Sequence, residues 1–149
     1  MAVDFPEITS FGTLLKFALA LEQTTADLEA RAAEAPVCAA HQGELTSMAD
    51  KHTRRIADLE RLQRERLNEV ILQPLGGMAR DEYLPPTALP VGADAAGLTR
   101  ALADLEDLSA RFYGDAAERA VNLLGGLDRT FKRFVKEDRK RAQTLRQLG

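Results

Sequence analysis

The sequence is poor in the residues that build disulfides, thiolate metal sites and membrane spans. Of its 149 residues, one is cysteine (Cys38), two are histidine and none is tryptophan. A single cysteine cannot form an intrachain disulfide and leaves no second thiol for a CxxC metal site. The chain has no apolar run near the ~20 residues that a membrane-spanning helix needs. These shortages argue against disulfide-stabilised, thiolate-metal and helical membrane proteins.

The charge balance argues against a general surface for polyanions. The chain carries 20 Lys and Arg against 23 Asp and Glu, which gives a formal net charge of −3. Basic residues gather at 54–66 and 132–146, but acids interleave with them, as is typical of solvated helix faces. We therefore expect no nucleic-acid partner. The first residues lack a charged leader followed by an apolar core, so we expect a cytoplasmic protein without membrane association.

What the chain does have is enough length and apolar content for one helical domain. Hydrophobic residues make up 45% and charged residues 29%, as in soluble helical proteins. Apolar residues recur at helical spacing in four stretches, which predict helices at about 10–34, 38–70, 94–124 and 128–148. Thr9 or Ser10 can cap the first helix, because a short hydroxyl side chain accepts from free backbone N–H groups. Asp94 and Asp128 can cap the third and fourth helices in the same way.

The segment 71–93 breaks the helical pattern. It contains helix-stopping residues throughout, namely Pro74, Gly76, Gly77, Pro85, Pro86, Pro90 and Gly92. So long a loop is unusual inside a compact domain, but an extended chain at ~3.3 Å per residue can run the length of a ~30-residue helix. The second and third helices would then be parallel, as in bundles with one long crossover. Several apolar side chains can hold this crossover against the helices: Leu72, Leu75, Met78, Tyr83 and Leu84.

Each apolar stripe is interrupted near its middle by polar residues. These are Glu22 in the first stripe, His52 and Arg55 in the second, Glu106 in the third, and Asp138 and Arg141 in the fourth. The two residues of each pair are three positions apart and therefore share a helix face. Burying an unpaired charge is costly. Four interruptions at matching depth therefore predict a polar site inside a four-helix bundle.

The two halves of the chain resemble each other. Residues 14–29 align with 98–113, and residues 48–56 align with 134–142. The alignment pairs the polar residues, Glu22 with Glu106, His52 with Asp138, and Arg55 with Arg141. Each half therefore predicts a helical hairpin with one polar residue in its first helix and an i, i+3 polar pair in its second.

This layout resembles the ferritin-like superfamily, the rubrerythrin branch in particular. The resemblance covers the four predicted helices and rests on the repeat, the crossover and three dipeptides, Leu21-Glu22, Leu105-Glu106 and Phe112-Tyr113. It implies an all-α, ferritin-like up-down four-helix bundle with a long crossover between helices two and three, residues 1–149 forming a single domain. In that family, helices one and three each give a Glu, and helices two and four each give Glu-x-x-His, to bind two iron or manganese ions.

The sequence departs from the family pattern at four ligand positions. Glu22 and Glu106 keep the family's ligand type. The changed positions are His52 and Asp138, where the family has Glu, and Arg55 and Arg141, where it has His. A guanidinium has no lone pair to give a metal. An alternative alignment with Glu137 as the acid and Lys140 as its partner restores no ligand either.

Three interpretations of the polar residues remain open. In the first, a buried ion-pair network links Arg55 and Arg141 to the carboxylates of Glu22, Glu106 and Asp138. The chain is then a non-catalytic structural or interaction protein without a cofactor. In the second, the carboxylates form part of a metal site. In the third, the two arginines clamp an organic anion. Arginine at both positions favours the first interpretation.

The second interpretation is a metal site. Glu22, His52, Glu106 and Asp138 offer oxygen and imidazole ligands suited to iron or manganese, provided that the long arginine stems swing outward. The protein would then serve iron handling, or oxygen or peroxide chemistry, as a di-metal oxidoreductase. Tyr113 is expected to pack beside the site with a bonded hydroxyl. Under any interpretation we expect a homodimer or larger homo-oligomer formed through a helix pair, and a protein partner is also plausible.

Overall fold

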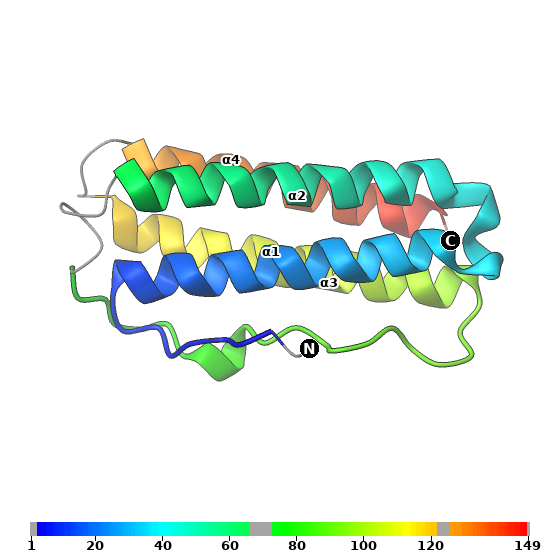
Figure 1. Cartoon of the computed structure of the whole chain (residues 1–149), viewed down its shortest axis with the longest axis horizontal. Coiled ribbons are helices and arrows are strands. Elements are labelled where there is room, and N and C mark those ends of the chain that lie inside the picture. The colour runs from blue at the N-terminus through cyan, green and yellow to red at the C-terminus, as the bar shows by residue number, and fades with distance from the viewer. Residues whose placement is uncertain (1–2, 66–72, 122–125, 149) are drawn as a thin grey trace.

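The computed structural model describes residues 3–65, 73–121 and 126–148 (Figure 1). Within these residues every named element of secondary structure is a helix. The long helices are α1 (Phe11–Glu34), α2 (Gln42–Glu65), α3 (Ala95–Ala120) and α4 (Leu127–Leu148). Two short 3-10 helices, η1 (Pro36–His41) and η2 (Arg80–Glu82), lie in the connections. The predicted all-α class is therefore confirmed for the described residues. None of the helices described has an apolar stretch long enough to cross a membrane.

The predicted helices agree with the structure except at the start of the second. Residues 38–41 were expected to be α-helical but belong to η1. Pro36 explains the difference, because it forces Ala35 into an extended conformation and ends α1 at Glu34. The chain then reverses through a tight 3-10 turn before α2 begins. The predicted helix ends at 66–70 and 122–124 lie outside the described residues.

Two of the predicted caps are present. The Ser10 hydroxyl accepts from the backbone N–H of Thr13 at 3.2 Å, and the Thr13 hydroxyl accepts from the backbone N–H of Ser10 at 3.0 Å. The Asp94 carboxylate accepts from the backbone N–H of Gly97 at 2.8 Å. The expectation for Asp128 was wrong, because α4 starts one residue earlier and places Asp128 in its first turn. Each cap stabilises its helix by about 1 kcal/mol.

The four long helices lie side by side as two antiparallel hairpins, α1 with α2 and α3 with α4 (Figure 1). Helices α2 and α3 run in the same direction in this view. The segment 73–94 runs along the outside of α1 and α3 to the start of α3. Backbone hydrogen bonds hold its first residues beside the start of α1, from Phe11 N–H to the Gln73 carbonyl and from Leu75 N–H to the Thr9 carbonyl.

Tyr83 fastens the middle of this segment to the helices. Its side chain is 1% exposed and packs edge-on against Phe17 of α1 and Phe112 of α3. Its hydroxyl donates to the carboxylate of Asp115. The expectation that Leu84 is also buried against the helices was wrong, because this next residue is 43% exposed.

The other expected crossover contacts differ in depth. Met78 is buried and Leu75 is partly buried against the core. Leu72 lies outside the described residues. Among the apolar side chains predicted to hold the crossover, Tyr83 and Met78 are therefore the buried ones in the described residues.

Replacing Tyr83 by alanine should test this anchor. Tyr83→Ala removes a buried ring and is expected to lower the free energy of unfolding by about 3–5 kcal/mol. The neighbouring Leu84→Ala, at an exposed position, should change it by about 0.5 kcal/mol or less. Urea denaturation followed by circular dichroism measures both. Equal effects of the two substitutions would contradict the anchoring role of Tyr83.

Candidate functional site

The polar residues that interrupt the apolar stripes meet between the four helices. All of them are buried: Glu22 from α1, His52 and Arg55 from α2, Glu106 from α3, and Asp138 and Arg141 from α4. The two arginines, expected either to face inward or to swing outward, both face inward, with Arg55 3% and Arg141 9% exposed. Each residue lies on the buried stripe of its helix, so ordinary amphipathic packing brings the group together.

His52 is the centre of this group. Its Nδ1 lies 2.6 Å from Glu22 Oε1, and its Nε2 lies 2.7 Å from Glu106 Oε2. Burial disfavours the charged imidazole, but the charges of Glu106 and Glu22 outweigh it and raise the pKa of His52 well above its usual value. The ring is therefore an imidazolium that donates one N–H to each carboxylate. It joins α2 to both α1 and α3.

The two glutamates remain ionised. Burial opposes their charge, but His52 and Arg55 hold the pKa of Glu22 below its usual value. Burial likewise opposes the ionisation of Glu106, and His52 and Arg141 hold its pKa below the usual value. Each carboxylate is thus stabilised by one imidazolium and one guanidinium.

Arg55 links three helices. Its Nη1 lies 2.7 Å from Asp138 Oδ1 and 3.3 Å from Glu22 Oε2. Its Nη2 lies 2.9 Å from Oε1 of Glu137, the half-exposed neighbour of Asp138. The guanidinium carbon stands 4.3 Å from the centroid of the Phe134 ring, within cation–π range.

Arg141 makes the matching contacts in the second hairpin. Its Nη2 lies 2.6 Å from Asp138 Oδ1, and its Nε lies 3.3 Å from Glu106 Oε1. Asp138 Oδ2 also accepts from the Ser109 hydroxyl at 2.6 Å. Burial outweighs Arg55 and raises the pKa of Asp138 to about 6, which leaves this carboxylate ionised at neutral pH.

The internal repeat is visible in these contacts. Arg55 binds Glu22 within the first hairpin, and Arg141 binds Glu106 within the second. The symmetry fails at the next pair, because His52 is a cation where Asp138 is an anion. Both arginines can therefore bind Asp138, whereas His52 binds glutamates only.

Tyr113 and Glu29 form a further pair that the repeat relates. The Tyr113 hydroxyl donates to Glu22 Oε2 at 3.0 Å, as expected of a bonded hydroxyl beside the site. Sequence reasoning did not single out Glu29, although the alignment of 14–29 with 98–113 places it opposite Tyr113. The same alignment was the signal that could have found it.

Glu29 differs from the other carboxylates because it has no good partner. It is fully buried, and in its ionised form neither of its oxygens accepts a hydrogen bond, whereas a protonated Glu29 can donate one to Glu106. The nearest cationic atom is His52 Nε2, 3.5 Å from its Oε1. Burial and the neighbouring charge of Glu106 raise the pKa of Glu29 well above its usual value. The folded protein therefore favours the protonated, neutral form of Glu29 more strongly than water does.

The buried charges then cancel. The cations of the group are Arg55, Arg141 and protonated His52, and the anions are Glu22, Glu106 and Asp138. When Glu29 is protonated it adds no charge, and three positive charges then face three negative ones. Glu137 lies outside this sum because it is half exposed at the rim. An interior that excludes bulk solvent favours such a balance, since an uncompensated buried charge is costly.

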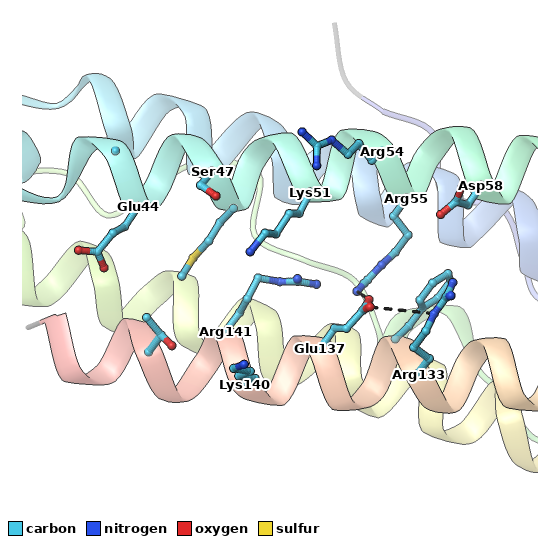
Figure 2. A pocket seen from close by; sticks show the side chains of 14 residues that line it. Glu44, Ser47, Lys51, Arg54, Arg55, Asp58, Arg133, Glu137, Lys140 and Arg141 are labelled. Atoms are coloured by element: carbon cyan, nitrogen blue, oxygen red, sulfur yellow. Dashed lines mark hydrogen bonds and ion pairs between the residues drawn. The ribbon is translucent and has the colours of Figure 1, made fainter.

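A groove of about 680 Å³ between α2 and α4 leads to this group from outside. Figure 2 shows Arg55 reaching from α2 and Arg141 from α4 into the space between these helices. Exposed cations line its outer part: Lys51, Arg54, Arg133 and Lys140. The two buried arginines therefore stand between the groove and the carboxylates.

The predicted metal-ligand set is brought together but is already engaged. Asp138 binds both guanidinium groups, and Glu22 is shared between His52 and Arg55. The centre of two metal ions implied by the family resemblance does not fit, because guanidinium groups lie where its histidine ligands would be. A different trio, Glu29, His52 and Glu106, offers ligand atoms that all lie within 4.8 Å of one another.

Removing one buried guanidinium should show how much the network depends on it. Arg55→Ala leaves Asp138 and Glu22 with less compensation and is expected to lower the free energy of unfolding by about 3–5 kcal/mol. Arg54→Ala, at the exposed neighbouring position, should cost about 0.5 kcal/mol or less. Urea titrations of the two variants measure the difference. A small loss for Arg55→Ala would show that its charge is not needed inside the fold.

The pH dependence of stability should reveal protonated Glu29. Its pKa is raised above 4.5, so the stability it contributes is full below that pH and is lost as pH rises through the folded pKa. The stability that protonated His52 contributes is likewise full below pH 6.5 and is lost as pH rises through its folded pKa. In that range each group that stays protonated only in the folded state lowers the free energy of unfolding by about 1.4 kcal/mol per pH unit. Stability should therefore fall from neutral to alkaline pH.

Glu29→Gln isolates this contribution, because the amide is neutral at every pH. The variant should lose less stability than the wild type as pH rises in urea titrations from about pH 4.5 to 9. Glu34→Gln, at an exposed position of α1, serves as the matched control and should keep the wild-type slope. A Glu29→Gln slope equal to that of the wild type would mean that Glu29 is already ionised in the fold.

Comparison with known proteins adds no further constraint. No protein-family model, curated protein or solved structure matches this chain. What the site does must therefore be argued from its own geometry and charges.

Proposed function

We propose that the chain is a ferritin-like, rubrerythrin-like four-helix bundle whose di-metal centre has been replaced by an arginine–carboxylate network. In this proposal it acts as a non-catalytic structural or interaction protein. Three features support the ferritin-like part: the repeat of two hairpins, the common direction of α2 and α3, and the path of 73–94 along α1 and α3 (Figure 1). Bundles with one long crossover have this arrangement.

The observation that carries the proposal is the inward position of both arginines. Arg55 and Arg141 stand at the sequence positions where the family has histidine ligands. Each one lies 3.3 Å from a glutamate that the family uses as a ligand, Glu22 or Glu106. Two permanent positive charges thus neutralise carboxylates that would otherwise need metal ions.

A network of this kind is suited to a structural role. His52, Arg55 and Arg141 connect carboxylates on α1, α3 and α4, so a shift of any helix would separate buried charges. Such networks add little net stability compared with apolar packing, but a mismatched arrangement is heavily penalised. We infer that the network fixes the relative positions of the helices. Association of the chain into a homodimer stays a prediction.

The alternative function, an iron or manganese protein in iron handling or oxygen and peroxide chemistry, places its ions on Glu22, His52, Glu106 and Asp138. That placement requires both arginines to leave the site. Their departure would remove partners from Glu22, Glu106 and Asp138 before any ion arrived. The ion-pair proposal avoids this cost. It predicts that purified protein binds no pair of metal ions.

Restoring the family's ligands should recover a centre that the wild type lacks. The restored variant combines four substitutions: His52→Glu, Arg55→His, Asp138→Glu and Arg141→His. It should bind about two iron ions per chain and absorb in the near ultraviolet after oxidation. Plasma mass spectrometry and absorption spectra of protein loaded with Fe(II) or Mn(II) measure this. Arg54→His with Lys140→His, at exposed positions, is the matched control.

Two outcomes would contradict the proposal. A restored variant that folds but binds no metal would mean that the ferritin-like alignment is wrong. Wild-type protein that binds two ions per chain, and loses them on Glu22→Ala or Glu106→Ala, would mean that the arginines have not replaced the metal centre.

A further inference from the structure

Within the part of the chain that the structure describes, Glu29 is the one buried carboxyl group that the ion-pair network does not explain. Among the described residues, its two oxygens are the only buried side-chain nitrogen or oxygen atoms without a hydrogen-bond partner. A proton shared with Glu106 satisfies at most one of these two oxygens, so the other carries the cost of a buried acceptor without a donor. Alanine or leucine at this position would avoid the cost. A ligand that engages the free oxygens would offset it.

The surroundings of Glu29 indicate what that ligand is. Its Oε1 lies 3.5 Å from His52 Nε2, and the same nitrogen lies 2.7 Å from Glu106 Oε2. Ligand atoms around a tetrahedral cation stand about 3.4 Å apart when each bond is about 2.1 Å. The first separation already fits, and the second opens to this value once the hydrogen bond between His52 and Glu106 gives way to a shared cation.

We propose that Glu29, His52 and Glu106 form a site for a single divalent transition-metal cation. One imidazole nitrogen and two carboxylates make a mixed set that suits zinc, ferrous iron or manganese better than magnesium or calcium. Three protein ligands leave a fourth position open. The inference goes beyond the proposed function and does not depend on the ferritin-like alignment, which assigns no ligand to Glu29.

The contacts around the trio already orient its ligands. His52 Nδ1 donates to Glu22 Oε1, which leaves Nε2 directed at Glu106 and Glu29. A carboxylate that fixes the second nitrogen of a ligating histidine is a common support of metal sites. Glu22 is therefore a positioning residue here and does not itself touch the cation.

The arginines can stay in place when the cation binds. Arg141 contacts Glu106 through Oε1, whereas Oε2 faces His52. Arg55 contacts Glu22 and Asp138, which are not ligands in this proposal. The site therefore adds one cation to the network, whereas a centre of two ions would need both guanidinium groups removed.

The buried charge also remains balanced. A divalent cation brings two positive charges and displaces the proton on Nε2 of His52 together with any proton on Glu29. The four carboxylates of Glu22, Glu29, Glu106 and Asp138 then face two guanidinium groups and the cation. The sum is again zero, so cation and protons are interchangeable occupants of the same interior.

Isothermal titration of untagged, metal-free protein with Zn(II) tests the site. Wild-type protein should bind about one ion per chain and release protons, measured by repeating the titration in buffers of different ionisation enthalpy. Glu29→Gln should weaken binding at least tenfold. Glu22→Gln should weaken it by about 10–100-fold by loosening His52. Glu34→Gln, the exposed control on α1, should bind as the wild type does, and Mg(II) should not compete.

The outcomes separate this inference from the proposed function. Folded wild-type protein that binds no Zn(II) overturns the cation site and leaves the ion-pair proposal intact. Binding that survives Glu29→Gln places the cation elsewhere and also overturns the site. Two ions per chain would instead overturn the ion-pair proposal. Loss of binding in Glu29→Gln cannot be ascribed to unfolding if thermal melts show this variant to be at least as stable as the wild type.

Discussion

The contact on which the rest of the structure depends is the imidazolium of His52 between Glu22 and Glu106. It lies at the centre of the helices, where a charge without a partner would be too costly to bury. The charged residues around His52 are arranged to compensate its charge and one another. Two carboxylates hold the ring protonated, and two guanidinium groups let those carboxylates remain charged together with Asp138. Helix α2 brings two positive charges, His52 and Arg55, which the single negative charges of Glu22 on α1 and Glu106 on α3 balance, so helix packing must bring these helices to one level.

The aromatic residues connect this charged centre to the crossover. Tyr83 packs on Phe112, and Phe112 packs on Tyr113, whose hydroxyl reaches Glu22. On the other side, Tyr113 packs edge-on against Phe134, the ring below the Arg55 guanidinium. A flat ring face attracts a cation and needs no hydrogen bond from it. The apolar core and the ion pairs are therefore parts of one continuous packing arrangement.

How far the sequence could predict this molecule differs from residue to residue. Glu22, Glu106 and the two i, i+3 pairs interrupt apolar stripes, so periodicity alone indicated that they share the interior. Their partners could not be derived, because an arginine stem reaches either a buried carboxylate or solvent, and only the packed helices decide between them. Glu29 follows Glu22 by two turns on the same buried stripe, so helical spacing alone could have placed it inside. What the spacing could not predict is that, unlike Glu22, it would meet no guanidinium there.

The asymmetry between the two hairpins shows where chemistry can remain. The second hairpin has Tyr113, whose hydroxyl donates a hydrogen bond to Glu22. At the equivalent position the first hairpin has Glu29, whose oxygens accept no hydrogen bond. Where the second has Asp138, which both arginines satisfy, the first has His52, a group able to give up a proton. Tyrosine at 29 and a fixed anion at 52 would make the network symmetric and chemically inert. The departures from symmetry instead place Glu29, an acid that can lose its proton, beside His52, a base that can also lose one. Protons can therefore be exchanged for a cation on the side of the interior built by Glu29, His52 and Glu106.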